Sequence, residues 1–156
     1  MKVTFCKYQG AGNDFILIDN RSLGLDHENP AMIQQLSHRR FGIGADGVMF
    51  LQNKEGYDFE MVYYNADGKP SSMCGNGGRC IVSFAKHLRI IRQETTFLAV
   101  DGPHYAKISE DGWVSLQMID VSEVRKDAEA FVLDTGSPHY VLSCSKLNAK
   151  DVVSEG

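Results

Sequence analysis

Hydrophobic and polar positions along the chain predict strands that alternate with glycine turns and two helices. Short apolar runs typical of strands lie at residues 15–19, 48–51, 59–64, 96–100, 104–108 and 113–119. The last three runs are joined by Asp101-Gly102 and Asp111-Gly112, which are typical of an antiparallel meander. Because such turns are too short for parallel crossovers, we expect an α+β fold.

Two further stretches carry the signals of helices. Asn29 can cap a helix that has Pro30 in its first turn. The apolar positions of this helix are Met32, Ile33 and Leu36. In residues 79–91, apolar side chains recur at helical spacing, at Ile81, Val82, Phe84, Ala85, Leu88 and Ile91. The glycines of residues 75–78 are therefore predicted to precede or open the second helix.

The regular pattern loosens after residue 121. We expect residues 1–121 to form one α+β half and the polar residues 122–130 to be a linker. Strand-like runs resume at 131–133 and 140–144, so residues 131–156 are expected to start a second half. The pattern stops before this second half is complete, and we expect it to be interrupted.

Composition narrows the class of partner. With 156 residues, of which 43% are hydrophobic, the chain can bury one good core. A net charge of −4 without a run of Lys or Arg argues against nucleic acid or an anionic membrane as the main partner. No stretch is long and apolar enough to span a membrane, and residues 1–8 lack the apolar core of a secretory signal. We expect a cytoplasmic protein.

The four cysteines predict reduced thiols rather than disulfides or a metal site. A chain of this length and apolar content does not need disulfides to fold. Five residues separate Cys74 from Cys80, and no close Cys/His pair has the spacing of zinc ligands, so no metal is expected. Cys6 and Cys144 lie in strand-like runs and are predicted to be core thiols.

The most informative segment is residues 73–80, Met-Cys-Gly-Asn-Gly-Gly-Arg-Cys. It places the Cys74 thiol directly before glycines and a helix start. There, unpaired backbone N–H groups and the helix dipole can stabilise both a thiolate and a bound carboxylate. The simpler interpretation is a glycine-rich turn with an incidental cysteine, and other motifs must decide between the two.

Three more glycine turns present Asn or Asp side chains beside strands: Gly-Ala-Gly-Asn-Asp-Phe at 10–15, Gly-Ile-Gly-Ala-Asp-Gly at 42–47 and Asn-Ala-Asp-Gly at 65–68. Singly, each Asn or Asp is better explained as a turn cap. In this order, together with residues 73–80 and a looser Ser-Pro-His at 137–139, they resemble the diaminopimelate epimerase family. The likeness extends over essentially the whole chain.

The resemblance implies a fold of two similar halves, each a curved, mostly antiparallel sheet around a central helix, with the substrate in the cleft between them. It implies that one thiol from each half works on the α-hydrogen of L,L-diaminopimelate, giving the meso isomer for lysine and cell-wall precursor synthesis without a cofactor. Cys74 matches the first-half thiol and His139 the histidine that partners it. The matching substrate-binding positions are Asn13, Asn65 and the backbone amides of Gly75 and Asn76.

Some positions depart from the family pattern. Gly47 and Ser137 stand where many relatives carry side-chain amides, which leaves recognition of the distal end of the substrate open. The second catalytic cysteine is not found in this sequence, so we expect the 156-residue chain to be inactive by itself. The sequence leaves a homodimer open.

Two alternative functions remain at this point. The chain could be a carboxylate-binding half-domain without turnover. It could also be a proline racemase-like enzyme, although that motif normally carries His where this chain has Asn76. Nucleotide binding lacks its glycine-lysine fingerprint, and no lysine suggests a pyridoxal site.

Overall fold

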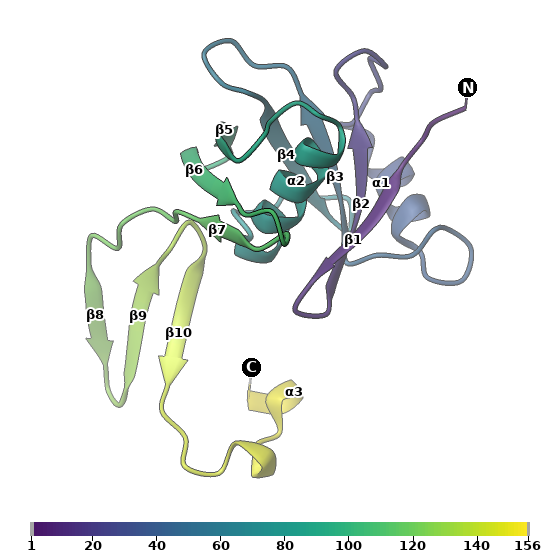
Figure 1. Ribbon diagram of the computed structural model, residues 1–156. Helices are drawn as coiled ribbons and strands as arrows, with labels where there is room; N and C mark the ends of the chain where they lie inside the picture. The colour runs from purple at the N-terminus through teal and green to yellow at the C-terminus, as the bar shows by residue number, and fades with distance from the viewer. Residues whose placement is uncertain (1, 156) are drawn as a thin grey trace. The chain divides into compact units, whose positions relative to one another are not determined.

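A curved seven-stranded sheet surrounds one helix in the first part of the chain (Figure 1). The computed structural model describes residues 2–155 and divides the chain into two units, the first ending at Ile119. In the first unit the strands follow one another in chain order: β1 (Cys6–Gly10), β2 (Asn13–Asp19), β3 (Gly47–Gln52), β4 (Glu60–Asn65), β5 (Glu94–Ala99), β6 (Gly102–Ile108) and β7 (Val114–Leu116). The predicted strands and the α+β class are confirmed.

Two of the strand pairings in this sheet are parallel. Strand β2 pairs in parallel with β3, and β4 pairs in parallel with β5, whereas the neighbours on either side are antiparallel. The parallel pairs are connected by the segments that hold α1 (Pro30–Ser37) and α2 (Gly75–His87). The meander β5–β7 is antiparallel, as its short turns predicted. The two parallel pairs were not predicted, because their strands are joined by long segments that contain a helix.

Helix α2 lies inside the curve of the sheet, between β1–β3 and β6–β7 (Figure 1). Its predicted apolar face, including Ile81, Phe84 and Ala85, is buried against the sheet. Full burial of a side chain such as Ile81 contributes about 1.5–3 kcal/mol relative to exposure. The stacked rings of Phe59 and Phe97, 5.0 Å apart between centroids, belong to the same core. This packing fixes where the first turn of α2 lies.

Helix α1 covers the opposite face of the sheet. Its start is capped as the sequence predicts, because Asn29 Oδ1 accepts a hydrogen bond from Met32 N at 3.2 Å and Pro30 opens the helix. Ile33 is fully buried against the outward-facing side chains of β2 and β3, such as Ile16 and Val48. The sheet therefore has a core on each face, and α1 with its following loop brings residues 38–46 to one edge of the sheet.

The second unit, residues 120–156, contains a three-stranded antiparallel sheet, formed by β8 (Val124–Asp127), β9 (Ala130–Asp134) and β10 (Pro138–Leu142), then η1 (Leu147–Ala149) and α3 (Val152–Glu155). Residues 122–130, predicted to be a linker, contain β8. All four residues of β8 are exposed, and their sequence has no alternation of apolar and polar residues from which a strand could be predicted. The strand is formed by backbone pairing with β9.

The prediction that Cys144 is a core thiol is wrong. Cys144 is exposed, because β10 ends at Leu142 and the following residues pack against no core. Cys6, by contrast, is half-buried against the core around α2. Within the described residues, no helix is long and apolar enough to cross a membrane.

Candidate active site

Cys74 is the residue that caps the N-terminus of α2. Its backbone is extended, with φ −119° and ψ 113°, and the helix begins at the next residue. The Cys74 sulfur accepts a hydrogen bond from Gly77 N at 3.4 Å, and the Cys74 carbonyl accepts one from Gly78 N at 2.8 Å. The half-buried thiol thus faces the positive end of the helix dipole, where a thiolate is stabilised.

Two N–H groups of this first turn have no acceptor among residues 2–155. Gly77 and Gly78 donate to Cys74, but in the described part of the chain no hydrogen bond joins Gly75 N or Asn76 N to another group. Both residues are half-buried. Adjacent unpaired N–H groups at a helix N-terminus are suited to hold a carboxylate. These are the two residues to which the resemblance to the family assigns carboxylate binding.

The glycines of this turn fall into two kinds. A Cβ on Gly77 would lie 2.0 Å from Met49 Cε, and one on Gly78 would lie 2.6 Å from Leu116 Cδ2. A Cβ on Gly75 would meet nothing closer than 3.7 Å. Gly77 and Gly78 let the helix start approach the sheet closely, whereas a Cβ on Gly75 would make only ordinary contacts.

The asparagines reach the site through the strand register. A two-residue turn at Ala11 and Gly12, with φ of 53° and 86°, connects β1 to β2 and makes Asn13 the first residue of β2. Because β2 and β3 run parallel and β4 antiparallel to them, the starts of β2 and β3 and the end of β4 share one sheet edge. Asn65 lies there, opposite Gly47 in the ladder.

Of the two asparagines, Asn13 contacts the thiol directly. The Cys74 sulfur donates a hydrogen bond to Asn13 Oδ1 across 3.6 Å. Asn65 is exposed, and its backbone N–H is occupied by Lys69 O at 3.0 Å in the turn that follows β4. The structure thus brings Asn13 to the thiol and Asn65 to the same edge of the sheet.

A cluster of charged side chains lies behind Asn13. Asp46 Oδ2 accepts a hydrogen bond from Asn13 Nδ2 at 2.7 Å, and Arg39 bonds both Asp14 and Asp46 at 2.8 Å. The Arg39 guanidinium, and then Lys7, hold the pKa of Asp14 well below its usual range. The sequence did not indicate Arg39 and Lys7 as site residues. They reach the site only through the pairing of distant strands, which no local pattern reveals.

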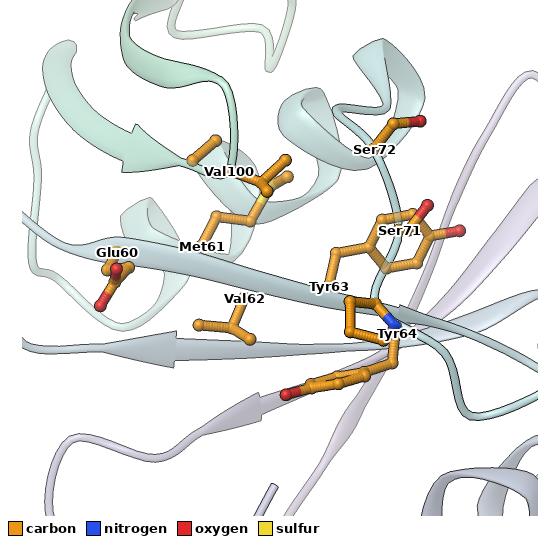
Figure 2. A pocket seen from close by; sticks show the side chains of 10 residues that line it. Glu60, Met61, Val62, Tyr63, Tyr64, Ser71, Ser72 and Val100 are labelled. Atoms are coloured by element: carbon orange, nitrogen blue, oxygen red, sulfur yellow. The ribbon is translucent and has the colours of Figure 1, made fainter. Parts of the chain in front are cut away.

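Tyr63 lies near the thiol, and no sequence pattern indicated it. Its ring covers Gly47, where a Cβ would lie 2.5 Å from Tyr63 Cε2. Burial, then the nearby Cys74, raise the pKa of Tyr63 to about 12, against a hydrogen bond with Ser71 that lowers it. Figure 2 shows Tyr63 and Ser71 among the residues around a small hollow of about 190 Å³ on β4. The phenol therefore stays protonated at neutral pH and cannot serve as a base.

Cys80 is excluded as the reactive thiol of this motif. It lies further along α2, is only 4% exposed, and packs in the core. Burial raises the pKa of Cys80 to about 11, although Arg79 acts in the opposite direction. Arg79 itself donates to Asn76 Oδ1, so its cation lies over the helix start beside the two unpaired N–H groups.

His139 belongs to the second unit, on β10. Its ring is exposed, and Nδ1 lies 2.6 Å from Ser137 O. Because a carbonyl oxygen can only accept, Nδ1 carries the hydrogen and Nε2 of the neutral ring is left as a proton acceptor. In residues 2–155, no group of three or more His, Cys, Asp or Glu side chains is arranged to hold a metal ion.

Comparison with known proteins identifies relatives across most of the chain. A family model described as diaminopimelate epimerase matches residues 5–124. A diaminopimelate epimerase from Flavobacterium psychrophilum is 55% identical over 150 residues, covering 96% of this chain and 59% of the relative. One from Chlorobaculum tepidum is 43% identical over 155 residues, covering 94% and 60%. The chain therefore spans about three-fifths of the length of these relatives.

Solved structures share the fold at low sequence identity. A PhzF-family phenazine biosynthesis protein from Bacillus anthracis superposes with a TM-score of 0.68 at 14% identity, covering 90% of this chain and 55% of that one. A probable proline racemase from Agrobacterium radiobacter, solved with bound carbonate, gives 0.64 at 12% identity, covering 96% and 54%. At such identity the likeness concerns the fold alone.

Proposed function

The chain belongs to the diaminopimelate epimerase family, and we propose that it supplies one side of the acid/base chemistry that converts L,L-diaminopimelate to the meso isomer. The observation that carries the proposal is the pairing of the Cys74 thiol with the unpaired N–H groups of Gly75 and Asn76. It combines a base and a carboxylate site in one helix turn.

The proposed binding mode starts from the α-carboxylate. Its oxygens accept hydrogen bonds from Gly75 N and Asn76 N, with the Arg79 cation nearby. This brings the α-carbon next to the Cys74 sulfur. The Cys74 thiolate then removes the α-proton, and the electron pair of the C–H bond is delocalised into the carboxylate, where the same donors stabilise the added charge.

Inversion requires that the new proton arrive from the opposite face. We propose that a second thiol delivers it, and that this thiol comes from outside the described chain. Cys80 is buried on the same helix, Cys6 is half-buried in β1, and Cys144 follows a strand rather than capping a helix. One proton leaves and one enters, so no cofactor or redox partner is needed.

His139 has the role of a proton acceptor in this proposal. Its Nδ1–H donates to Ser137 O, which leaves Nε2 able to accept a proton. The resemblance of residues 137–139 to the family motif supports the Cys74 thiol as the source of that proton. Asn13 and Asn65 contact the substrate from the sheet edge. The same proposal includes a place in lysine and cell-wall precursor synthesis, which the family name supports, and a location in the cytoplasm.

The test is epimerisation by the full-length gene product. The protein is incubated with L,L-diaminopimelate in D₂O. The stereoisomers are then separated, and their deuterium content is measured by mass spectrometry. The expected product is the meso isomer carrying one deuterium at the inverted carbon. Lack of conversion, or racemisation of proline in its place, would refute the assignment.

The 156-residue chain alone provides a second arm. It is expected to give no meso product because it supplies only the Cys74 thiol at the start of α2, and the proposed second thiol lies outside it. Turnover by the purified 156-residue chain would contradict the proposal that the second thiol lies outside it.

A further inference from the structure

Asn13 lies between the reactive thiol and a carboxylate. Its Nδ2 donates to Asp46 Oδ2 at 2.7 Å, and its Oδ1 accepts from the Cys74 sulfur at 3.6 Å. A carboxylate oxygen can only accept a hydrogen bond at this distance, so the amide end that faces Asp46 must be the NH₂ group. The carbonyl end then faces the thiol.

Asp46 is itself held from several sides. Asp14 N donates to Asp46 Oδ2 at 3.1 Å, and Arg39 Nη2 donates to Asp46 Oδ1 at 2.8 Å. Asp46 N donates back to Asp14 Oδ1 at 3.1 Å. Lys7 completes the cluster by bonding Asp14 Oδ2 at 2.8 Å. With both of its oxygens occupied, the Asp46 carboxylate cannot turn away from Asn13.

We propose that Asp46 is a positioning residue that fixes the orientation of the Asn13 amide, so that Asn13 presents only an acceptor to the site. The proposal rests on the role of Cys74 as the base in the proposed function. If the amide turned over, Asn13 Oδ1 would lie 2.7 Å from Asp46 Oδ2, and two acceptor oxygens would repel each other.

This orientation has a consequence for the thiol. An acceptor at Asn13 Oδ1 stabilises the protonated thiol, which can donate to it, over the thiolate, which cannot. A substrate ammonium group is a donor that matches Oδ1, and when it binds there the thiol loses its acceptor. Asp46 thereby makes the thiolate state of Cys74 depend on the presence of the substrate.

Other groups also act on the Cys74 sulfur and have to be separated from this effect. The Gly77 N–H and the helix dipole favour the thiolate. The phenol of Tyr63 and the buried thiol of Cys80 interact with Cys74 electrostatically. Asp46 also carries a negative charge, which would disfavour a thiolate even without the amide. A test therefore needs a control for charge alone.

The experiment compares Asp46→Asn with Asp14→Asn in the full-length protein. Each variant removes one carboxylate from the same cluster, but only Asp46→Asn replaces a carboxylate that can only accept from Asn13 with an amide whose NH₂ group can donate to it. Alkylation of Cys74 by iodoacetamide is followed from pH 5 to 10 by mass spectrometry of the peptide that contains it. Circular dichroism establishes that both variants are folded.

In Asp46→Asn, the Arg39 guanidinium attracts the remaining side-chain oxygen at position 46, which leaves the new NH₂ group facing Asn13. The Asn13 amide can then turn, accept from this NH₂ group and donate to the thiolate. The alkylation profile of this variant is expected to shift to lower pH, with a rate at pH 7 about three- to tenfold above that of the unsubstituted protein. Asp14→Asn is expected to stay within about twofold, on the order of a screened surface charge. An equal shift in both variants, or none in Asp46→Asn, would overturn the proposal.

A second pair of variants tests whether Asp46 acts through Asn13. In an Asn13→Ala background, Asp46→Asn is expected to change the alkylation rate by no more than about twofold, the size of a screened charge, because no amide remains to be turned. A shift of the same size in that background as in the unsubstituted protein would also overturn the proposal. Alkylation of Cys74 does not require turnover, so its result can be interpreted even if the epimerase assay fails.

Discussion

Gly77→Ala and Gly75→Ala separate the packing role of the glycine-rich turn from its chemical role. Both substitutions add one methyl group to the first turn of α2. At Gly77 the new Cβ would lie 2.0 Å from Met49 Cε, about half of a normal carbon–carbon contact distance. At Gly75 the nearest atom would be 3.7 Å away, an ordinary contact.

The expected magnitude follows from the surroundings of Met49. Met49 is fully buried between β3 and α2, so its flexible end can yield only by displacing other core side chains. Such overpacking costs about 1–3 kcal/mol. Alanine in place of glycine favours a helix by up to about 1 kcal/mol, and this gain applies to both variants. The difference between them therefore isolates the overpacking.

Thermal and urea unfolding, monitored by circular dichroism, measure that difference. We expect Gly77→Ala to be about 1–3 kcal/mol less stable than Gly75→Ala, which for a chain of this size is a melting temperature several degrees lower. Gly78→Ala, with a contact of 2.6 Å to Leu116, is expected to fall between them. Equal stabilities of Gly77→Ala and Gly75→Ala would refute the claim that close packing of helix on sheet requires Gly77.

Two further predictions concern titration. Hydrogen bonds from Arg39 and then Lys7 lower the pKa of Asp14, so its contribution to stability is present above about pH 4 and is lost as pH falls through the folded-state value. Asp14→Asn should flatten the fall in unfolding free energy between about pH 4 and 2, and an unchanged slope in urea titrations would contradict this. Because burial raises the pKa of Cys80 to about 11, iodoacetamide at pH 8 should label Cys80 far more slowly than the exposed Cys144, and equal labelling would show that Cys80 is accessible.

Local patterns were sufficient to predict the elements that carry the site. The spacing of apolar residues after Arg79 and the glycines before it predicted α2 with Cys74 at its mouth, as the structure has it. The Asn-Pro signal predicted the capped start of α1. In both cases the decisive interactions lie within one turn of helix, so a short window of sequence contains them.

Partnerships between distant residues could not be predicted in the same way. The parallel pairing of β2 with β3 depends on a crossover through α1, and it alone brings Asp46 next to Asn13. Arg39 reaches Asp14 across the same register. Exposure of Cys144 depends on where β10 ends, which an apolar run of three or four residues does not define.

The most direct test of the central claim is hydrogen exchange at the α-carbon in the Cys74→Ala variant of the full-length protein, with Cys80→Ala as the matched control. Each variant is incubated with L,L-diaminopimelate in D₂O, and loss of the α-hydrogen signal is followed by NMR. We predict that Cys74→Ala abolishes both exchange and formation of the meso isomer, whereas Cys80→Ala retains both. Undiminished epimerisation by Cys74→Ala would contradict the assignment of Cys74 as the base.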